Sequence, residues 1–143
     1  MVEKSVLLVL AVVIAVPITT GCLGQDAQSP SDWNVSFSEP KTGIGFSDRY
    51  YGGSEGGQLI YGLPNVTEES NISEILVTRY TENNGEYNKH SATKGSIYEN
   101  FSQIYLDAPL KSSEYQSYRY SIVAKNESGA VIDSINATVT RNE

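Results

Sequence analysis

The fold is decided by residues 118–139, which read YRYSIVAKNESGAVIDSINATV. In the first half, Tyr120, Ile122 and Ala124 stand at every second position, and the same two-residue repeat returns in the second half from Val131. Strict alternation is typical of half-buried strands in an antiparallel sheet with one face in water. A Ser-Gly turn signal separates the two halves, so this stretch predicts two neighbouring strands.

The same repeat occurs upstream, and turn signals rich in glycine, proline and asparagine separate its segments. Asn84-Gly85 is the strongest hairpin signal, because both residues tolerate a positive φ. We expect the glycine-rich segment 52–57 to form a flexible loop. Short strands with frequent turns over about 110 residues predict an all-β sandwich. The residues expected to fill its core are Trp33, Val35, Phe37, Val77, Ile104, Leu106, Tyr120, Ile122, Ile135 and Val139.

The segment 120–129 resembles the F strand and F–G turn of fibronectin type III domains, in its order Tyr-x-Ile-x-Ala-x-Asn-x-x-Gly. The family's B-strand tryptophan is missing, since residues 58–63 offer only Tyr61 in its place. The resemblance implies an antiparallel immunoglobulin-like β-sandwich and a role in binding or spacing, without naming a ligand. The other matching segments are 72–80 with the C strand, 82–87 with the C–C′ hairpin, and 104–109 with the E strand and E–F corner.

The N-terminal segment carries an apolar run, residues 6–16, after Lys4. The run is shorter than the about 20 residues that a membrane-spanning helix needs. It suits the apolar region of a secretory signal peptide. The following Thr19-Thr20-Gly21-Cys22 resembles the lipobox of prokaryotic lipoproteins, in the looser form of archaeal ones, with Thr19 where bacterial sequences prefer leucine. In that family the cysteine carries a diacylglycerol and becomes the new N-terminus.

The expected organisation is therefore a signal peptide over residues 1–21, a polar tether over 22–31 and one β-sandwich domain over 32–143. Lipid on Cys22 would anchor the chain to the extracytoplasmic face of the cell membrane, because two acyl chains hold stably. Two alternatives stay open: an uncleaved signal anchor, and secretion without lipid.

The chain has 17 acidic and 10 basic residues and a net charge of −7. Binding to nucleic acid or to anionic lipid needs positive patches, and this acidic composition favours neither. The acidic residues are scattered along the sequence, so we interpret them as a solubilising surface. An envelope protein or a glycan is the expected partner besides the membrane, and nucleic acid is not.

Six Asn-x-Ser/Thr triplets mark candidate glycosylation sites, against about two expected from composition alone. This excess favours an exported protein, although asparagine, serine and threonine also gather in turns. The strand phase places Asn34, Asn100 and Asn136 on the wet face, whereas Asn65 and Asn126 fall in turns. The acceptors are Asn34, Asn65, Asn71, Asn100, Asn126 and Asn136.

Catalytic and metal-binding motifs are weak. Ser54 stands in a Gly-x-Ser-x-Gly pattern, but the hydrolase elbow that uses this pattern needs a strand-to-helix turn and a larger fold. The single histidine, His90, lies in a polar strand. Zinc sites need clusters of cysteine and histidine, and this chain has one of each. Glu68 and Glu69, beside Asn65 and Asn71, could hold an ion weakly, but we interpret this segment as a solvated loop and expect no cofactor and no metal.

Ten tyrosines outnumber the other aromatic residues. Exposed tyrosine clusters favour recognition, because the ring supplies contact area and the hydroxyl a polar tip. Tyrosine is also a good strand residue. Tyr118 and Tyr120 share the inward phase of Ile122, which favours the strand interpretation for them. The leading hypothesis is a non-enzymatic binding or envelope-associated module, and the alternative is an accessory hydrolase using Ser54 or two carboxylates that folding brings together.

The anchor predicts a mature chain that starts at Cys22 and is heavier than its sequence by a lipid. Intact-mass spectrometry of membrane extracts checks this expectation. A Cys22→Ser variant is the matched control and should yield no lipidated species. A soluble protein that keeps residues 1–21 would contradict the anchor.

Overall fold

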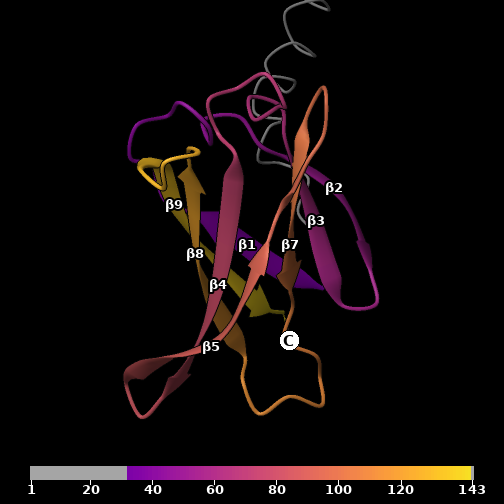
Figure 1. Cartoon of the computed structure of the whole chain (residues 1–143). Helices are drawn as coiled ribbons and strands as arrows, with labels where there is room; N and C mark the ends of the chain where they lie inside the picture. The colour runs from indigo at the N-terminus through magenta and orange to yellow at the C-terminus, as the bar shows by residue number, and fades with distance from the viewer. Residues whose placement is uncertain (1–31, 143) are drawn as a thin grey trace, which may run out of the picture.

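Two antiparallel sheets pack face to face in the computed structural model, which describes residues 32–142 (Figure 1). The first sheet has the order β1-β9-β8-β4-β5 and the second β2-β3-β7-β6. Within the described residues there is no helix that is long and apolar enough to cross a membrane. The strands are β1 (Trp33–Phe37), β2 (Tyr50–Glu55), β3 (Gln58–Leu63), β4 (Glu74–Asn83), β5 (Glu86–Lys94), β6 (Ser96–Ile97), β7 (Ser102–Asp107), β8 (Ser117–Lys125) and β9 (Val131–Arg141).

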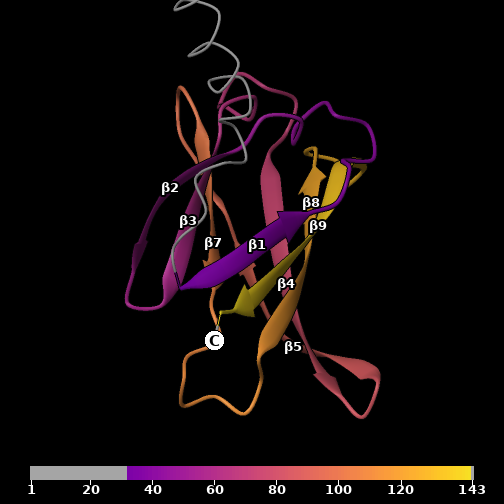
Figure 2. The same ribbon diagram turned by 180° about the vertical axis from the view of Figure 1, so that it is seen from behind.

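The strand order is that of an immunoglobulin-like sandwich. Strands β2, β3, β7 and β6 take the places of A, B, E and D, while β9, β8, β4 and β5 take those of G, F, C and C′. Strand β1 adds an edge, antiparallel to β9 (Figure 2). The predicted all-β, immunoglobulin-like sandwich is confirmed, and the segments that resemble C, E and F lie in β4, β7 and β8. The predicted leader and tether, residues 1–31, lie outside the described residues.

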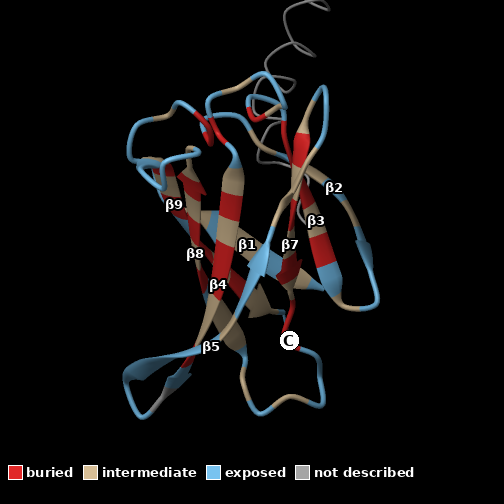
Figure 3. Cartoon of the chain, viewed as in Figure 1, coloured by how far each residue is buried: buried red, intermediate tan, exposed pale blue. Residues whose placement is uncertain are grey.

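The core lies between the sheets, where buried residues recur along the inner faces (Figure 3). All ten predicted core residues belong to it: seven are buried, and Trp33, Val35 and Phe37 of the edge strand β1 are partly buried against the others. Tyr61 of β3 is also buried, and Phe37 meets its ring edge-on at 5.1 Å between centroids. A tyrosine therefore fills the B-strand position where the fibronectin family has tryptophan.

The Asn84-Gly85 hairpin joins β4 to β5 as predicted. Asn84 has φ 55° and Gly85 φ 82°, the conformation that a two-residue hairpin of this kind requires. One prediction was wrong: residues 50–55 form the edge strand β2, not a flexible loop. A bulge after Tyr51 absorbs one residue, and Gly53 at φ 133° permits it, so only Gly56 and Gly57 form the turn.

Asp133 is fully buried in β9 and shapes the connection from β1 to β2. Its Oδ1 accepts hydrogen bonds from the backbone N–H groups of Thr42 and Ser134, each at 2.9 Å. Its Oδ2 accepts from those of Gly45 and Phe46, at 3.1 and 3.0 Å. Burial raises the pKa of this carboxyl, but the four hydrogen bonds together hold the pKa below its ordinary value.

Ile122→Asp should unfold the domain, because Ile122 is fully buried in the centre of β8 and its strand neighbours offer no partner for a charge. The cost is on the order of several kcal/mol, comparable with the whole free energy of unfolding. Asn136→Asp, on the exposed face of β9, should leave the melting temperature close to that of the parent. Thermal unfolding measures both, and a native-like melt of Ile122→Asp would contradict the register of β8.

Asp133→Asn should lower the free energy of unfolding at pH 7 by about 2–4 kcal/mol, because an amide cannot accept all the buried N–H groups. The pKa of Asp133 is lower in the folded protein than in the unfolded one. Its contribution to stability is therefore complete at pH values above the pKa of the unfolded state, and it is lost as the pH falls through the pKa of the folded state. Urea unfolding at pH 7 and about pH 3 tests both points. The parent should lose more stability on acidification than Asp133→Asn, and equal losses would contradict the role of Asp133.

Candidate binding site

A groove of about 500 Å³ crosses the outer face of the five-stranded sheet. The two-residue repeat builds it, because the neighbours of inward Tyr120 and Ile122 must point outward. Register aligns the groove side chains in rows across the strands. One such row runs across four neighbouring strands. Its members, in the order β4, β8, β9 and β1, are Tyr80, Arg119, Thr138 and Ser36.

One side of the groove is aromatic and cationic. The guanidinium carbon of Arg119 lies 4.5 Å from the ring centroid of Tyr87 on β5, and Tyr80 lines the groove beside them. Tyr87 is 46% exposed, so part of its ring stays open to a ligand. Its hydroxyl donates to Glu82 Oε2 at 3.4 Å, which anchors the ring near the turn of the β4–β5 hairpin.

The remaining lining of the groove is neutral and mixes polar side chains with Phe37, Tyr120 and Ala137. It presents serine and threonine hydroxyls, which donate and accept, and one carboxamide, which does both through separate atoms. Asn136 lies next to Ser121 in the register of β8 and β9. Arg119 is the one charged side chain among the residues that line the groove. The polar members are Ser36, Ser38, Ser121, Asn136 and Thr138.

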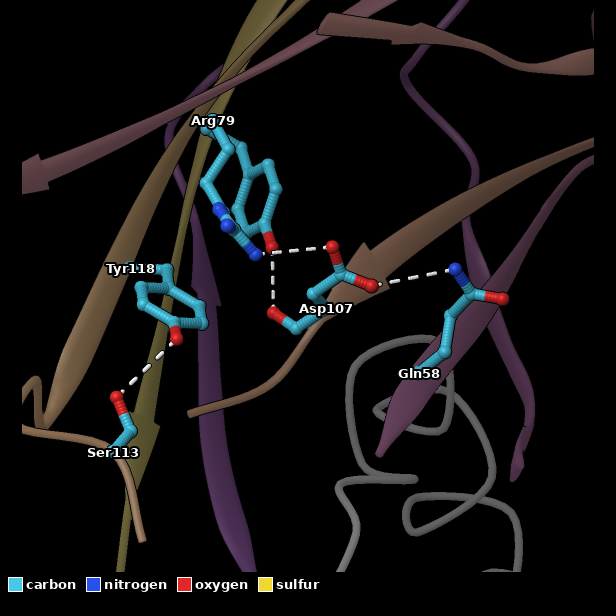
Figure 4. Close-up of polar contacts among 6 residues, drawn as sticks. Gln58, Arg79, Asp107, Ser113 and Tyr118 are labelled. Atoms are coloured by element: carbon cyan, nitrogen blue, oxygen red, sulfur yellow. Dashed lines mark hydrogen bonds and ion pairs between the residues drawn. The ribbon is translucent and has the colours of Figure 1, made fainter. Parts of the chain in front are cut away.

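A polar cluster between the sheets supports β8 beneath this face (Figure 4). Arg79 of β4 forms an ion pair with Asp107 of β7, with Nη1 and Oδ2 3.0 Å apart. The Tyr120 hydroxyl donates to the backbone carbonyl of Asp107 at 2.5 Å. Burial, and then the Asp107 carboxylate, raise the pKa of Tyr120, which keeps this donor protonated. Gln58 of β3 also donates to Asp107, at 3.3 Å.

The aromatic part of this cluster holds the start of β8. The guanidinium of Arg79 lies 4.5 Å from the ring centroid of Tyr118, whose hydroxyl is 3.4 Å from that of Ser113. A hollow of about 240 Å³ lies beside these residues. Because Arg79 already forms an ion pair with Asp107 of the other sheet, we interpret the cluster as a structural contact that holds the two sheets together and not as a ligand site.

A second surface hollow, of about 470 Å³, lies among the loops at the opposite end of the sandwich from the β2–β3 turn. Glu68 and Glu127 both line it, together with Asn71 and Asn126. Both carboxylates are exposed, so a difference in burial does not assign one of them as a general acid and the other as a general base. This is the one feature of the described hollows that fits the hydrolase alternative.

The predicted glycosylation acceptors all avoid the core. Five are exposed and Asn126 is half-buried. Asn136 lines the groove, and the amide of Asn65 donates to Ser47 Oγ and Asp48 Oδ2. In the β8–β9 turn, Asn126 Oδ1 accepts from Ser128 and Ala130. Their use as acceptors stays a prediction.

The residues weighed for catalysis lie apart in the sheet order. Ser54 is on β2, an edge of the four-stranded sheet, and His90 is on β5, an edge of the other. Within residues 32–142, no group of three or more histidine, cysteine, aspartate or glutamate side chains is placed to hold a metal ion. Cys22, the predicted lipidation site, lies outside the described residues.

Sequence reasoning missed the groove residues. The signal for Arg119 was present, because it stands between inward Tyr118 and Tyr120. Burial confirms the strand interpretation for these two: Tyr120 is buried and Tyr118 is partly buried against the core. Tyr87 gave no comparable signal, since β5 is exposed along almost its whole length and its position beside Arg119 depends on hairpin register.

No model of a known protein family matches the chain, and no curated protein matches it in sequence. Among solved structures, the chain is similar to chicken MD-1, described as complexed with lipid IVa, at 11% sequence identity and a TM-score of 0.49. The match covers 80% of this chain and 94% of MD-1. A likeness at this level supports no inference about function.

Proposed function

We propose that this chain is a non-enzymatic, lipid-anchored binding module of the cell surface, and that its outer-sheet groove binds a glycan. The observation that carries the proposal is the combination of the Arg119–Tyr87 stack and Tyr80 with hydroxyl and amide groups in one groove. The anchor rests on the resemblance of residues 19–22 to a lipobox, and Cys22 would carry the lipid.

The chemistry of the groove favours a saccharide over other ligand classes. A sugar ring offers C–H groups that fit the negative face of an aromatic ring, and its hydroxyls match serine, threonine and asparagine. Pockets for apolar ligands are lined predominantly by hydrophobic side chains, whereas six of the eleven residues that line this groove are polar or charged. Nucleic acid requires several cations, and the lining supplies only Arg119.

The groove also contains Asn136, a predicted acceptor. A glycan attached there and an external one would compete for the same surface. Binding is therefore best measured on protein made in a host that does not glycosylate Asn-x-Ser/Thr triplets.

Tyr87→Ala should weaken binding to immobilised oligosaccharides about two- to tenfold, because it removes one stacking ring. Arg119→Gln should weaken binding as well, since it removes the cation that packs on that ring. Tyr98→Ala is the matched control: Tyr98 is 43% exposed, close to the 46% of Tyr87, but lies outside the groove. Surface plasmon resonance against a panel of oligosaccharides measures all three.

The glycan proposal fails if no oligosaccharide binds, or if Tyr87→Ala and Arg119→Gln bind as the parent does. The same panel tests the hydrolase alternative that Glu68 and Glu127 raise. A hydrolase would shorten an oligosaccharide, and Glu68→Gln or Glu127→Gln would stop it.

A further inference from the structure

The two ends of the described chain meet at one end of the sandwich. The backbone N–H of Asn142 donates to the carbonyl of Asp32 at 2.9 Å, and Trp33 pairs with Arg141 between β1 and β9. The β7–β8 loop projects at this end, whereas the loop after β1 and the β8–β9 turn lie at the other (Figures 1 and 2). A membrane anchor on the N-terminal side of residue 32 would therefore join the domain at the end that contains Trp33.

This end carries apolar and cationic side chains around a hollow of about 280 Å³. Leu110 at its rim is 49% exposed, although most large apolar side chains of the domain are buried. Lys111 and Arg141 line the same hollow, and Asp32 is the one acidic residue among its described lining residues. Trp33 Nε1 donates to the carbonyl of Pro109 at 3.1 Å, which ties the loop to β1.

The chemistry of this end is that of a membrane interface. Tryptophan is enriched at the headgroup level, where its ring is partly apolar and its N–H is polar. Lysine and arginine can bury their stems while their charges reach phosphate groups. Asp32 and Glu114, the latter exposed in the same β7–β8 loop as Lys111, offset part of this positive charge, whereas acidic residues more than about 8 Å away are largely screened at physiological salt.

We propose that the end formed by Trp33, Leu110, Lys111 and Arg141 docks on the surface of an anionic lipid bilayer. This inference rests on the proposed anchoring, and the length of the tether supports it. The ten residues from Cys22 to Ser31 span at most about 36 Å when fully extended. A lipid on Cys22 and an uncleaved signal anchor would both hold this end next to the membrane, whereas secretion without an anchor would not.

Trp33 is the only tryptophan of the chain and reports on docking directly. The experiment uses protein extracted from its own membrane and reconstituted into vesicles of phosphatidylcholine and phosphatidylglycerol with brominated acyl chains. Trp33 fluorescence should be quenched. Lys111→Gln should shift the docked-to-undocked ratio about fivefold towards the undocked state. Leu110→Ser should also reduce the quenching.

Two matched controls lie at the opposite end of the sandwich. Ile44 is 62% exposed and Lys41 is exposed, both in the loop after β1. Ile44→Ser and Lys41→Gln should leave the quenching unchanged. Absent quenching in attached protein, or equal quenching in Leu110→Ser, Lys111→Gln and the parent, would overturn the docking proposal.

Vesicle flotation in the same samples separates docking from anchoring. Protein that does not float shows that the proposed anchor is wrong. Coupling Cys22, the single cysteine, to a maleimide lipid then supplies the attachment, and the quenching comparison still decides whether this end docks.

Discussion

The two-residue repeat of β8 is the constraint that links the core to the candidate groove. Tyr120 and Ile122 fill the interior, so Arg119 and Ser121 between them must lie on the outer face. A shift of one residue would exchange the two sets and bury Arg119. The core therefore fixes the positions of the groove residues on β8, and hydrogen-bonded pairing carries the same phase to β4 and β9.

Polar groups hold the sandwich at two places. At the first, the Asp107 carboxylate forms an ion pair with Arg79, and the Asp107 backbone carbonyl accepts a hydrogen bond from the Tyr120 hydroxyl. These contacts join β4 and β8 of one sheet to β7 of the other. At the second, Asp133 satisfies four backbone N–H groups and closes the loop between β1 and β2. The Asp133 carboxylate is fully buried, and its four hydrogen bonds remove the penalty of an unpaired buried charge.

The sequence predicted the fold wherever one face of a strand is buried, because burial imposes a visible alternation. The ten core residues and the Asn84-Gly85 hairpin follow from this pattern and from local turn chemistry. The edge strand β2 was missed because its glycines carry no side chain to show a phase, and pairing with β3 decides its conformation. Tyr87 could not be assigned to the groove for a related reason. Strand β5 is exposed along almost its whole length, and only its register with β4 and the twist of the hairpin bring the ring to Arg119.

The proposed docking surface and the proposed groove occupy different parts of the molecule, and their chemistry differs accordingly. At the end near residue 32, Lys111 and Arg141 accompany Trp33 and exposed Leu110. This set suits the membrane interface, where charged headgroups lie next to apolar acyl chains. On the sheet face, neutral hydroxyls surround a stacked arginine, a set suited to a polar ligand with flat apolar patches. The groove lies on the side of the sandwich and the docking surface at its end, and the β4–β5 hairpin that carries Tyr87 projects towards that same end (Figures 1 and 2). If this end docks, the antiparallel pairing of β1 with β9, which borders both surfaces, would hold the groove at one orientation to the membrane.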